Sequence, residues 1–108
     1  PEYVGNNIIK IARTIKQNSP STQIYVQTLL PTNKDFMKSN IDLVNTIITQ
    51  DFPNKIFSVI DLNTSFSDDK GFLKKDLTSD GTHLTEKGYL LWVKIEKDLI
   101  LSIQSNQK

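Results

Sequence analysis

Two short apolar segments, residues 24–30 and 56–62, constrain the fold of this 108-residue chain more than any other feature. Both are rich in β-branched and aromatic residues, and their apolar residues follow one another instead of alternating with polar ones. A strand that is apolar on both sides has to be covered on both sides, as interior strands of parallel sheets are. The two segments are therefore predicted to be parallel β-strands.

Three other segments have the spacing of amphipathic helices. Apolar residues recur at intervals of three and four over residues 4–17, from 37 to about 50, and from 85 to about 103. Thr85 is the predicted N-cap of the last helix, and residues 102–108 are expected to fray. The resulting order of helix, strand, helix, strand, long loop and helix is typical of an α/β fold with a parallel sheet between helical layers.

Two strands make a small sheet for three amphipathic helices, and one of these strands would have an open edge. We therefore expect the chain to be part of a larger doubly wound domain. The earlier strands would have been removed or would come from another chain, and a sequence that begins at Pro1 fits this expectation.

Composition excludes several classes of function. The 13 lysines and arginines are scattered among 12 aspartates and glutamates, with a net charge of +1, so neither nucleic acid nor an anionic membrane is an expected partner. Without cysteine there is no disulfide, no thiolate nucleophile and no Cys-ligated zinc, and one histidine cannot form a multi-histidine metal site. No apolar run approaches the ~20 residues that a membrane span needs.

Residues 63–82 show neither helical nor strand periodicity, apart from one helical turn expected near 64–67. Loops of this length are uncommon in compact domains and are usually functional. Sites of doubly wound sheets also form where the strands end. The chemistry is therefore expected after residue 62.

The only histidine, His83, lies at the end of this loop, three residues after Asp80. Gly81 between them permits a tight turn that would bring the carboxylate to the imidazole. A carboxylate on one ring nitrogen fixes the tautomer and leaves the other nitrogen free to take a proton from a nucleophile. By spacing alone, such a pair is more typical of a cap or a surface contact.

The sequence from Asp80 through Leu84, with Gly88, Tyr89 and Trp92 after it, resembles the C-terminal motif of the SGNH hydrolases, also called the GDSL esterase/lipase family. Residues 68–79 are similar to the segment that leads into this motif in small-ester acylhydrolases. Residues 24–33 and 56–62 are similar to the family's fourth and fifth strands, so the resemblance covers nearly the whole chain.

The resemblance implies a flavodoxin-like three-layer α/β/α fold of which residues 1–108 form the C-terminal half of a single domain, with the last two strands, their flanking helices and the C-terminal helix. It implies hydrolysis of a small-molecule carboxylic ester through an acyl-enzyme, without metal or cofactor. His83 would be the general base and Asp80 would orient it. Members of this kind are often exported by bacteria, so the resemblance would be consistent with a secreted or periplasmic location.

The family's Gly-Asp-Ser nucleophile motif, its second oxyanion glycine and its Gly-x-Asn-Asp motif do not occur in this sequence. The serine is therefore expected in a missing N-terminal half, and the isolated chain is expected to be inactive. The two loop asparagines at the strand ends, Asn33 and Asn63, are expected to make local backbone hydrogen bonds. The chain is expected to pair with its own N-terminal half or with another copy. Two alternatives remain, which are a non-catalytic module that pairs through its open edge with another chain, and a truncated product without function.

Overall fold

The computed structural model describes residues 1–51 and 56–106, which form an α/β fold with a two-stranded parallel sheet. The sheet pairs β1 (Tyr25–Gln27) with β2 (Ser58–Ile60), and Val26 lies opposite Val59. The helices are α1 (Glu2–Asn18), α2 (Asp35–Asp51), the short α3 (Leu62–Phe66), the 3₁₀ helix η2 (Lys75–Leu77) and α4 (Glu86–Asn106). The predicted parallel pairing of two strands between helices is confirmed.

Both strands are shorter than predicted, because side chains take over their backbone groups. At the end of β1, the Leu29 N–H donates to Asn45 Oδ1 over 2.7 Å, and Asn45 Nδ2 donates to the Leu29 carbonyl over 3.1 Å. After β2, Asp61 accepts a hydrogen bond from the Thr64 N–H and caps α3. β1 is therefore followed by hydrogen bonds to the Asn45 side chain, and β2 is followed by the first turn of α3.

The helices follow the predictions more closely. Thr85 Oγ1 accepts a hydrogen bond from the Gly88 N–H, as the predicted N-cap of α4 should. Of residues 102–108, which were expected to fray, residues 102–106 are part of α4, and residues 107 and 108 lie outside the described residues. The helix predicted to end at about residue 50 is α2, which ends at residue 51.

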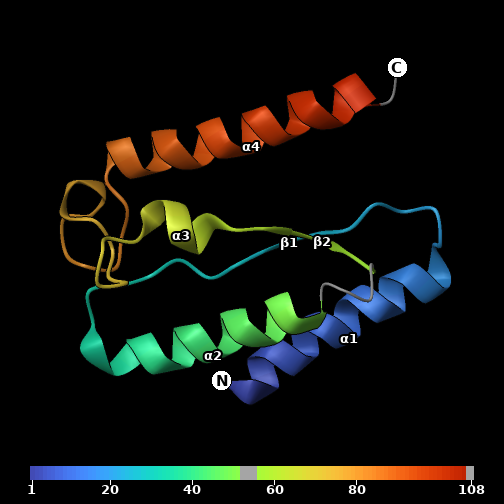
Figure 1. The fold of residues 1–108 in the computed structure, drawn as a ribbon, viewed down its shortest axis with the longest axis horizontal. Helices are drawn as coiled ribbons and strands as arrows, with labels where there is room; N and C mark the ends of the chain where they lie inside the picture. The colour runs from blue at the N-terminus through green and yellow to red at the C-terminus, as the bar shows by residue number, and fades with distance from the viewer. Residues whose placement is uncertain (52–55, 107–108) are drawn as a thin grey trace.

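Figure 1 shows α4 on one side of the strands and α1 with α2 on the other. Two apolar clusters correspond to these two sides. The first joins α1, α2 and the sheet, and the second joins α3, η2 and the segment before η2 to α4. The buried members of the first cluster are Ile9, Ala12, Val44, Ile48 and Phe57, and those of the second are Leu62, Phe66, Leu73 and Leu77.

The loop predicted over residues 63–82 has structure of its own. It contains most of α3, all of η2 and an isolated antiparallel bridge between Ser67 and Leu73, and a second bridge joins Thr78 to Leu84. Three of its own side chains are buried in the second cluster, namely those of Phe66, Leu73 and Leu77. The segment that precedes His83 is therefore anchored to the core at several points.

Several large apolar side chains are exposed on α1 and α4. On α1, Ile11 and Ile15 border a groove of about 330 Å³ that runs along β1. On α4, Tyr89 and Val93 are 55% and 60% exposed. Among the described helices, none is both long and apolar enough to cross a membrane.

Candidate functional site

The structure brings the two predicted site residues into direct contact. His83 Nδ1 lies 2.6 Å from Asp80 Oδ2, and the backbone N–H of His83 donates to Asp80 Oδ1 over 2.7 Å. The Thr82 N–H donates to the same Oδ1 over 2.9 Å. Asp80 thus holds both the ring and the backbone of His83, in the loop that leads into α4.

Gly81 makes the turn between the two residues. Its φ of +91° lies in a region that residues with a side chain rarely adopt. Its carbonyl accepts a hydrogen bond of 2.7 Å from the N–H of Asn33, in the loop after β1. A Cβ at position 81 would lie 3.0 Å from Asn33 Cβ. The loop that holds Asp80 and His83 is therefore packed against the loop that follows β1.

The side chain of Thr78 makes two further hydrogen bonds within this loop. The Thr78 hydroxyl accepts from the Gly81 N–H over 2.9 Å and donates to the His83 carbonyl over 2.6 Å. Thr78 is only 9% exposed and forms the bridge with Leu84. Thr78 was not among the predicted site residues, although a threonine three residues before a turn glycine is a recognisable signal for a side-chain-to-backbone bond.

Hydrogen bonds also fix the charge of Asp80. Backbone N–H groups of His83 and Thr82, followed by the His83 ring, hold the pKa of the Asp80 carboxyl well below its usual range. The carboxylate is therefore ionised at neutral pH and can only accept hydrogen bonds. His83 Nδ1 must then carry the proton of their shared bond, so in the neutral form of the imidazole the free lone pair is on Nε2.

The Asp80–His83 dyad is open to solvent. The side chain of His83 is 81% exposed and that of Asp80 is 51% exposed. Within the part of the chain that the structure describes, the bonds to the His83 ring come from Asp80 and from Thr82 Oγ1, 3.3 Å from Nδ1. A hollow of about 340 Å³ adjoins the dyad and is lined by Asn33, Lys75, Thr78, Ser79, Asp80 and Gly81. The arrangement can accept a proton at Nε2 from a group that approaches from outside.

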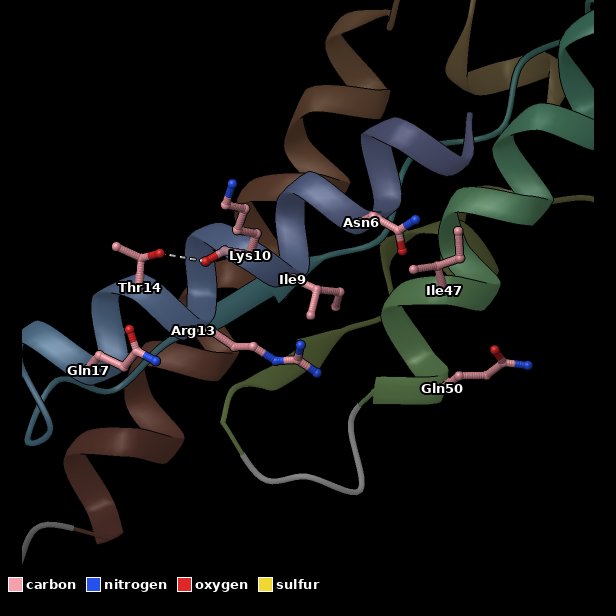
Figure 2. A pocket seen from close by; sticks show the side chains of 8 residues that line it. All are labelled: Asn6, Ile9, Lys10, Arg13, Thr14, Gln17, Ile47 and Gln50. Carbon is pink, nitrogen blue, oxygen red and sulfur yellow. Dashed lines mark hydrogen bonds between the residues drawn. The ribbon is translucent and has the colours of Figure 1, made fainter.

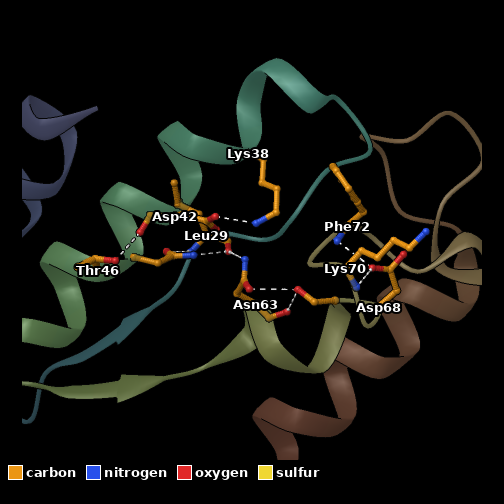
Figure 3. Close-up of polar contacts among 10 residues, drawn as sticks. Leu29, Lys38, Asp42, Thr46, Asn63, Asp68, Lys70 and Phe72 are labelled. Carbon is orange, nitrogen blue, oxygen red and sulfur yellow. Dashed lines mark hydrogen bonds and ion pairs between the residues drawn. The ribbon is translucent and has the colours of Figure 1, made fainter.

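The two loop asparagines make hydrogen bonds, but these are not the local side-chain bonds to the backbone that were predicted. Asn63 donates through Nδ2 to the Leu29 carbonyl over 3.0 Å, and its Oδ1 accepts from Ser67 Oγ over 3.1 Å (Figure 3). Asn33 donates from its backbone to Gly81. Both residues thus support the loops at the strand ends.

Glu96 lies in the middle of the apolar face of α4, at the edge of the core. Its Oε1 accepts a 2.8 Å hydrogen bond from Trp92 Nε1 and another from Gln27 Nε2 on β1. These partners are neutral amide and indole groups. Glu96 therefore joins α4 to the sheet by hydrogen bonds.

Two further features of the described residues lie apart from the Asp80–His83 pair or are absent. Among residues 1–51 and 56–106, no group of three or more His, Asp or Glu side chains is placed to hold a metal ion. A cavity of about 680 Å³ lies between α1 and α2 and is lined mostly by polar side chains, including Lys10, Arg13 and Gln50 (Figure 2). Neither Asp80 nor His83 lines it.

Comparison with protein-family models and with curated proteins gives no match. The chain is similar to half of a larger solved structure. That structure is described as a "putative platelet activating factor" from Streptococcus pneumonia, with a TM-score of 0.73 and 25% sequence identity. The match covers 88% of this chain and 49% of the streptococcal chain, so the present chain spans about half of its neighbour's length.

Proposed function

We propose that this chain is the base-bearing half of an SGNH-type serine ester hydrolase with a flavodoxin-like fold. The observation that carries the proposal is the Asp80–His83 pair, with Nδ1 and the carboxylate 2.6 Å apart on the loop that leads into α4. The streptococcal neighbour supports it in two ways. Its fold is similar and its chain is about twice as long. Its name refers to a phospholipid, a class of molecule that contains ester bonds.

In the proposed reaction, a serine from the other half of the domain attacks the ester carbonyl while His83 Nε2 takes the proton from its hydroxyl. The tetrahedral intermediate then loses the alcohol, which receives that proton from Nε2, and leaves an acyl-serine. Water attacks the acyl-serine in the same way, so the acid is released and the serine is regenerated. Asp80 keeps Nδ1 protonated and stabilises the imidazolium that forms in each half-reaction.

The other half is proposed to pack on the open edge of β1. Thr28 donates its N–H to the Ile60 carbonyl over 3.0 Å, so the backbone groups at even positions of β1 point to β2. Those of Tyr25 and Gln27 therefore point away from β2, to the side where a further strand could add. The groove of about 330 Å³ beside β1, bordered by Ile11 and Ile15, offers that half an apolar surface to cover.

The proposal is tested with the longer polypeptide that contains these residues together with the segment encoded before them. We expect it to hydrolyse p-nitrophenyl acetate, and we expect His83→Ala to lose at least about two orders of magnitude in kcat, which general-base catalysis typically supplies. Asp80→Asn should lose most of the rate, whereas Asp69→Asn, which removes the same charge from an exposed position, should be as active as the parent. Full activity of His83→Ala would refute the proposal.

The open edge also favours a second candidate, a module that binds another protein by pairing of β-strands. It needs the edge of β1 but not the dyad. In that case the longer polypeptide would not hydrolyse esters at a rate that depends on His83, while substitutions along the groove, such as Ile11→Lys, would still abolish binding of the partner.

A further inference from the structure

We propose that Thr78 is the positioning residue of the Asp80–His83 pair, because its hydroxyl fixes the loop conformation in which the backbone and the ring of His83 both reach the Asp80 carboxylate. The conformational part of this proposal stands on contacts within the chain. Its catalytic consequence rests on the proposed function.

The hydroxyl spans the turn from inside. It accepts from the Gly81 N–H at 2.9 Å and donates to the His83 carbonyl at 2.6 Å, so one oxygen atom ties together the two residues on either side of Thr82. The peptide units at Gly81 and His83 consequently cannot rotate independently. The orientation of the His83 N–H toward Asp80 Oδ1 follows from this arrangement.

Thr78 is itself held in place, as a positioning residue has to be. It is 9% exposed and pairs with Leu84 in an antiparallel bridge. Its neighbour Leu77 is 3% exposed, and the Leu77 carbonyl accepts a hydrogen bond of 2.9 Å from the Thr85 N–H. The hydroxyl is thus attached to the second apolar cluster, whereas His83 and Asp80 lie in solvent. A rigid support beneath an exposed pair reduces the reorientation that each turnover would otherwise need.

Thr28 provides a matched control in the same chain. It is the other buried threonine, 4% exposed, and its hydroxyl also accepts from one backbone N–H, that of Asn63 at 3.0 Å, and donates to one oxygen, Asp61 Oδ1 at 3.3 Å. Thr28→Val and Thr78→Val therefore remove the same chemistry from equally buried positions. Only the second removes it from the loop of the dyad.

The test uses the 108-residue chain, with Thr78→Val, Thr78→Ser and Thr28→Val. NMR measures the titration of the Asp80 carboxyl and the hydrogen exchange of the Gly81 and His83 amides. In Thr78→Val we expect the pKa of Asp80 to rise toward its usual value and both amides to exchange about 3- to 10-fold faster, as the loss of one hydrogen bond predicts. Thr78→Ser, which keeps the hydroxyl, should retain the parent behaviour. If Thr28→Val raises the pKa of Asp80 as much, or Thr78→Val does not raise it, Thr78 does not position the pair.

A second measurement separates this inference from the proposed function. In the longer polypeptide, Thr78→Val should lower kcat for p-nitrophenyl acetate with little change in KM, and Thr78→Ser should restore kcat. A rise in the pKa of Asp80 without any change in ester hydrolysis would leave the positioning role intact and refute the catalytic one. An unchanged pKa of Asp80 together with a rate that depends on His83 would refute the positioning role alone.

Discussion

Replacement of Gly81 by alanine should destabilise the chain more than the same replacement at Gly71. Both glycines have a positive φ, +91° at Gly81 and +86° at Gly71, so both substitutions incur a similar backbone strain. Their surroundings differ. A Cβ at Gly81 would lie 3.0 Å from Asn33 Cβ, whereas a Cβ at Gly71 would lie 3.0 Å from Lys38 Cε and Nζ, at the end of a flexible side chain.

The shared strain costs about 1–2 kcal/mol at each position. At Gly71, Lys38 can move aside, so little is added. At Gly81, the contact is at least about 0.5 Å inside the optimum for two carbon atoms. Asn33 cannot retreat without stretching its 2.7 Å hydrogen bond to the Gly81 carbonyl. Overpacking of this kind adds about 1–3 kcal/mol, so we expect a total loss of about 2–5 kcal/mol for Gly81→Ala.

Urea unfolding of the two variants, followed by Trp92 fluorescence, measures the difference. With a slope of about 1–3 kcal/mol per M, the midpoint of Gly81→Ala should lie roughly 1 M below that of Gly71→Ala. The Asp80 carboxyl should also titrate closer to its usual pKa in Gly81→Ala, because the turn that brings it to the His83 N–H is disturbed. A midpoint for Gly81→Ala at or above that of Gly71→Ala would refute the packing of the loop against Asn33.

Three further predictions concern other parts of the molecule. Phe66→Ala should lower the free energy of unfolding in urea by about 3–5 kcal/mol, because Phe66 is fully buried, whereas Phe36→Ala, 78% exposed in the parent, should change it by less than about 0.5 kcal/mol. Because the pKa of Asp80 is lowered in the folded chain, its hydrogen bonds stabilise the fold fully at pH values above the usual pKa of 3.8. This contribution is lost as the pH falls through the lower pKa of the folded chain. The free energies of unfolding of the parent and of Asp80→Asn should therefore approach each other as the pH is lowered. Glu96→Ala leaves the Trp92 indole N–H without its acceptor, so it should lower the free energy of unfolding by about 1–3 kcal/mol and change the fluorescence of the native state.

The pattern of the sequence was sufficient for the arrangement of helices and strands, because periodicity and continuous apolar runs report which faces are covered. It was insufficient for the ends of the strands. Asn45 is 16 residues away from Leu29, and nothing in the local pattern indicates that its amide would bind both backbone groups of that residue. Such ends are decided by contacts between distant residues, which a local pattern does not contain.

The same distinction applies to the site. The proximity of Asp80 and His83 follows from three consecutive local properties, which are a short polar side chain, a glycine in the turn and an imidazole three positions on. The support beneath them is not local in this sense. The contact between Gly81 and Asn33 joins residues 48 positions apart by number, and it exists only because the fold brings the loop before α4 against the loop after β1. The sequence therefore predicted that Asp80 and His83 lie together, but it did not predict which residues support them.

Two exposed features of the molecule have a common explanation under the proposed function. His83 is the most exposed member of the site, although a general base works best against a nucleophile in a site from which water is excluded. Tyr89 and Val93 lie on α4, within ten residues of His83, and are more than half exposed as well. A half-domain that added a strand to β1 and covered α4 would bury these apolar side chains and bring its serine to Nε2 in the same step. Assembly of the active site would then be driven by apolar surface at a distance from the reacting atoms, so that Asp80 and His83 could keep the geometry that Thr78 and Gly81 already give them.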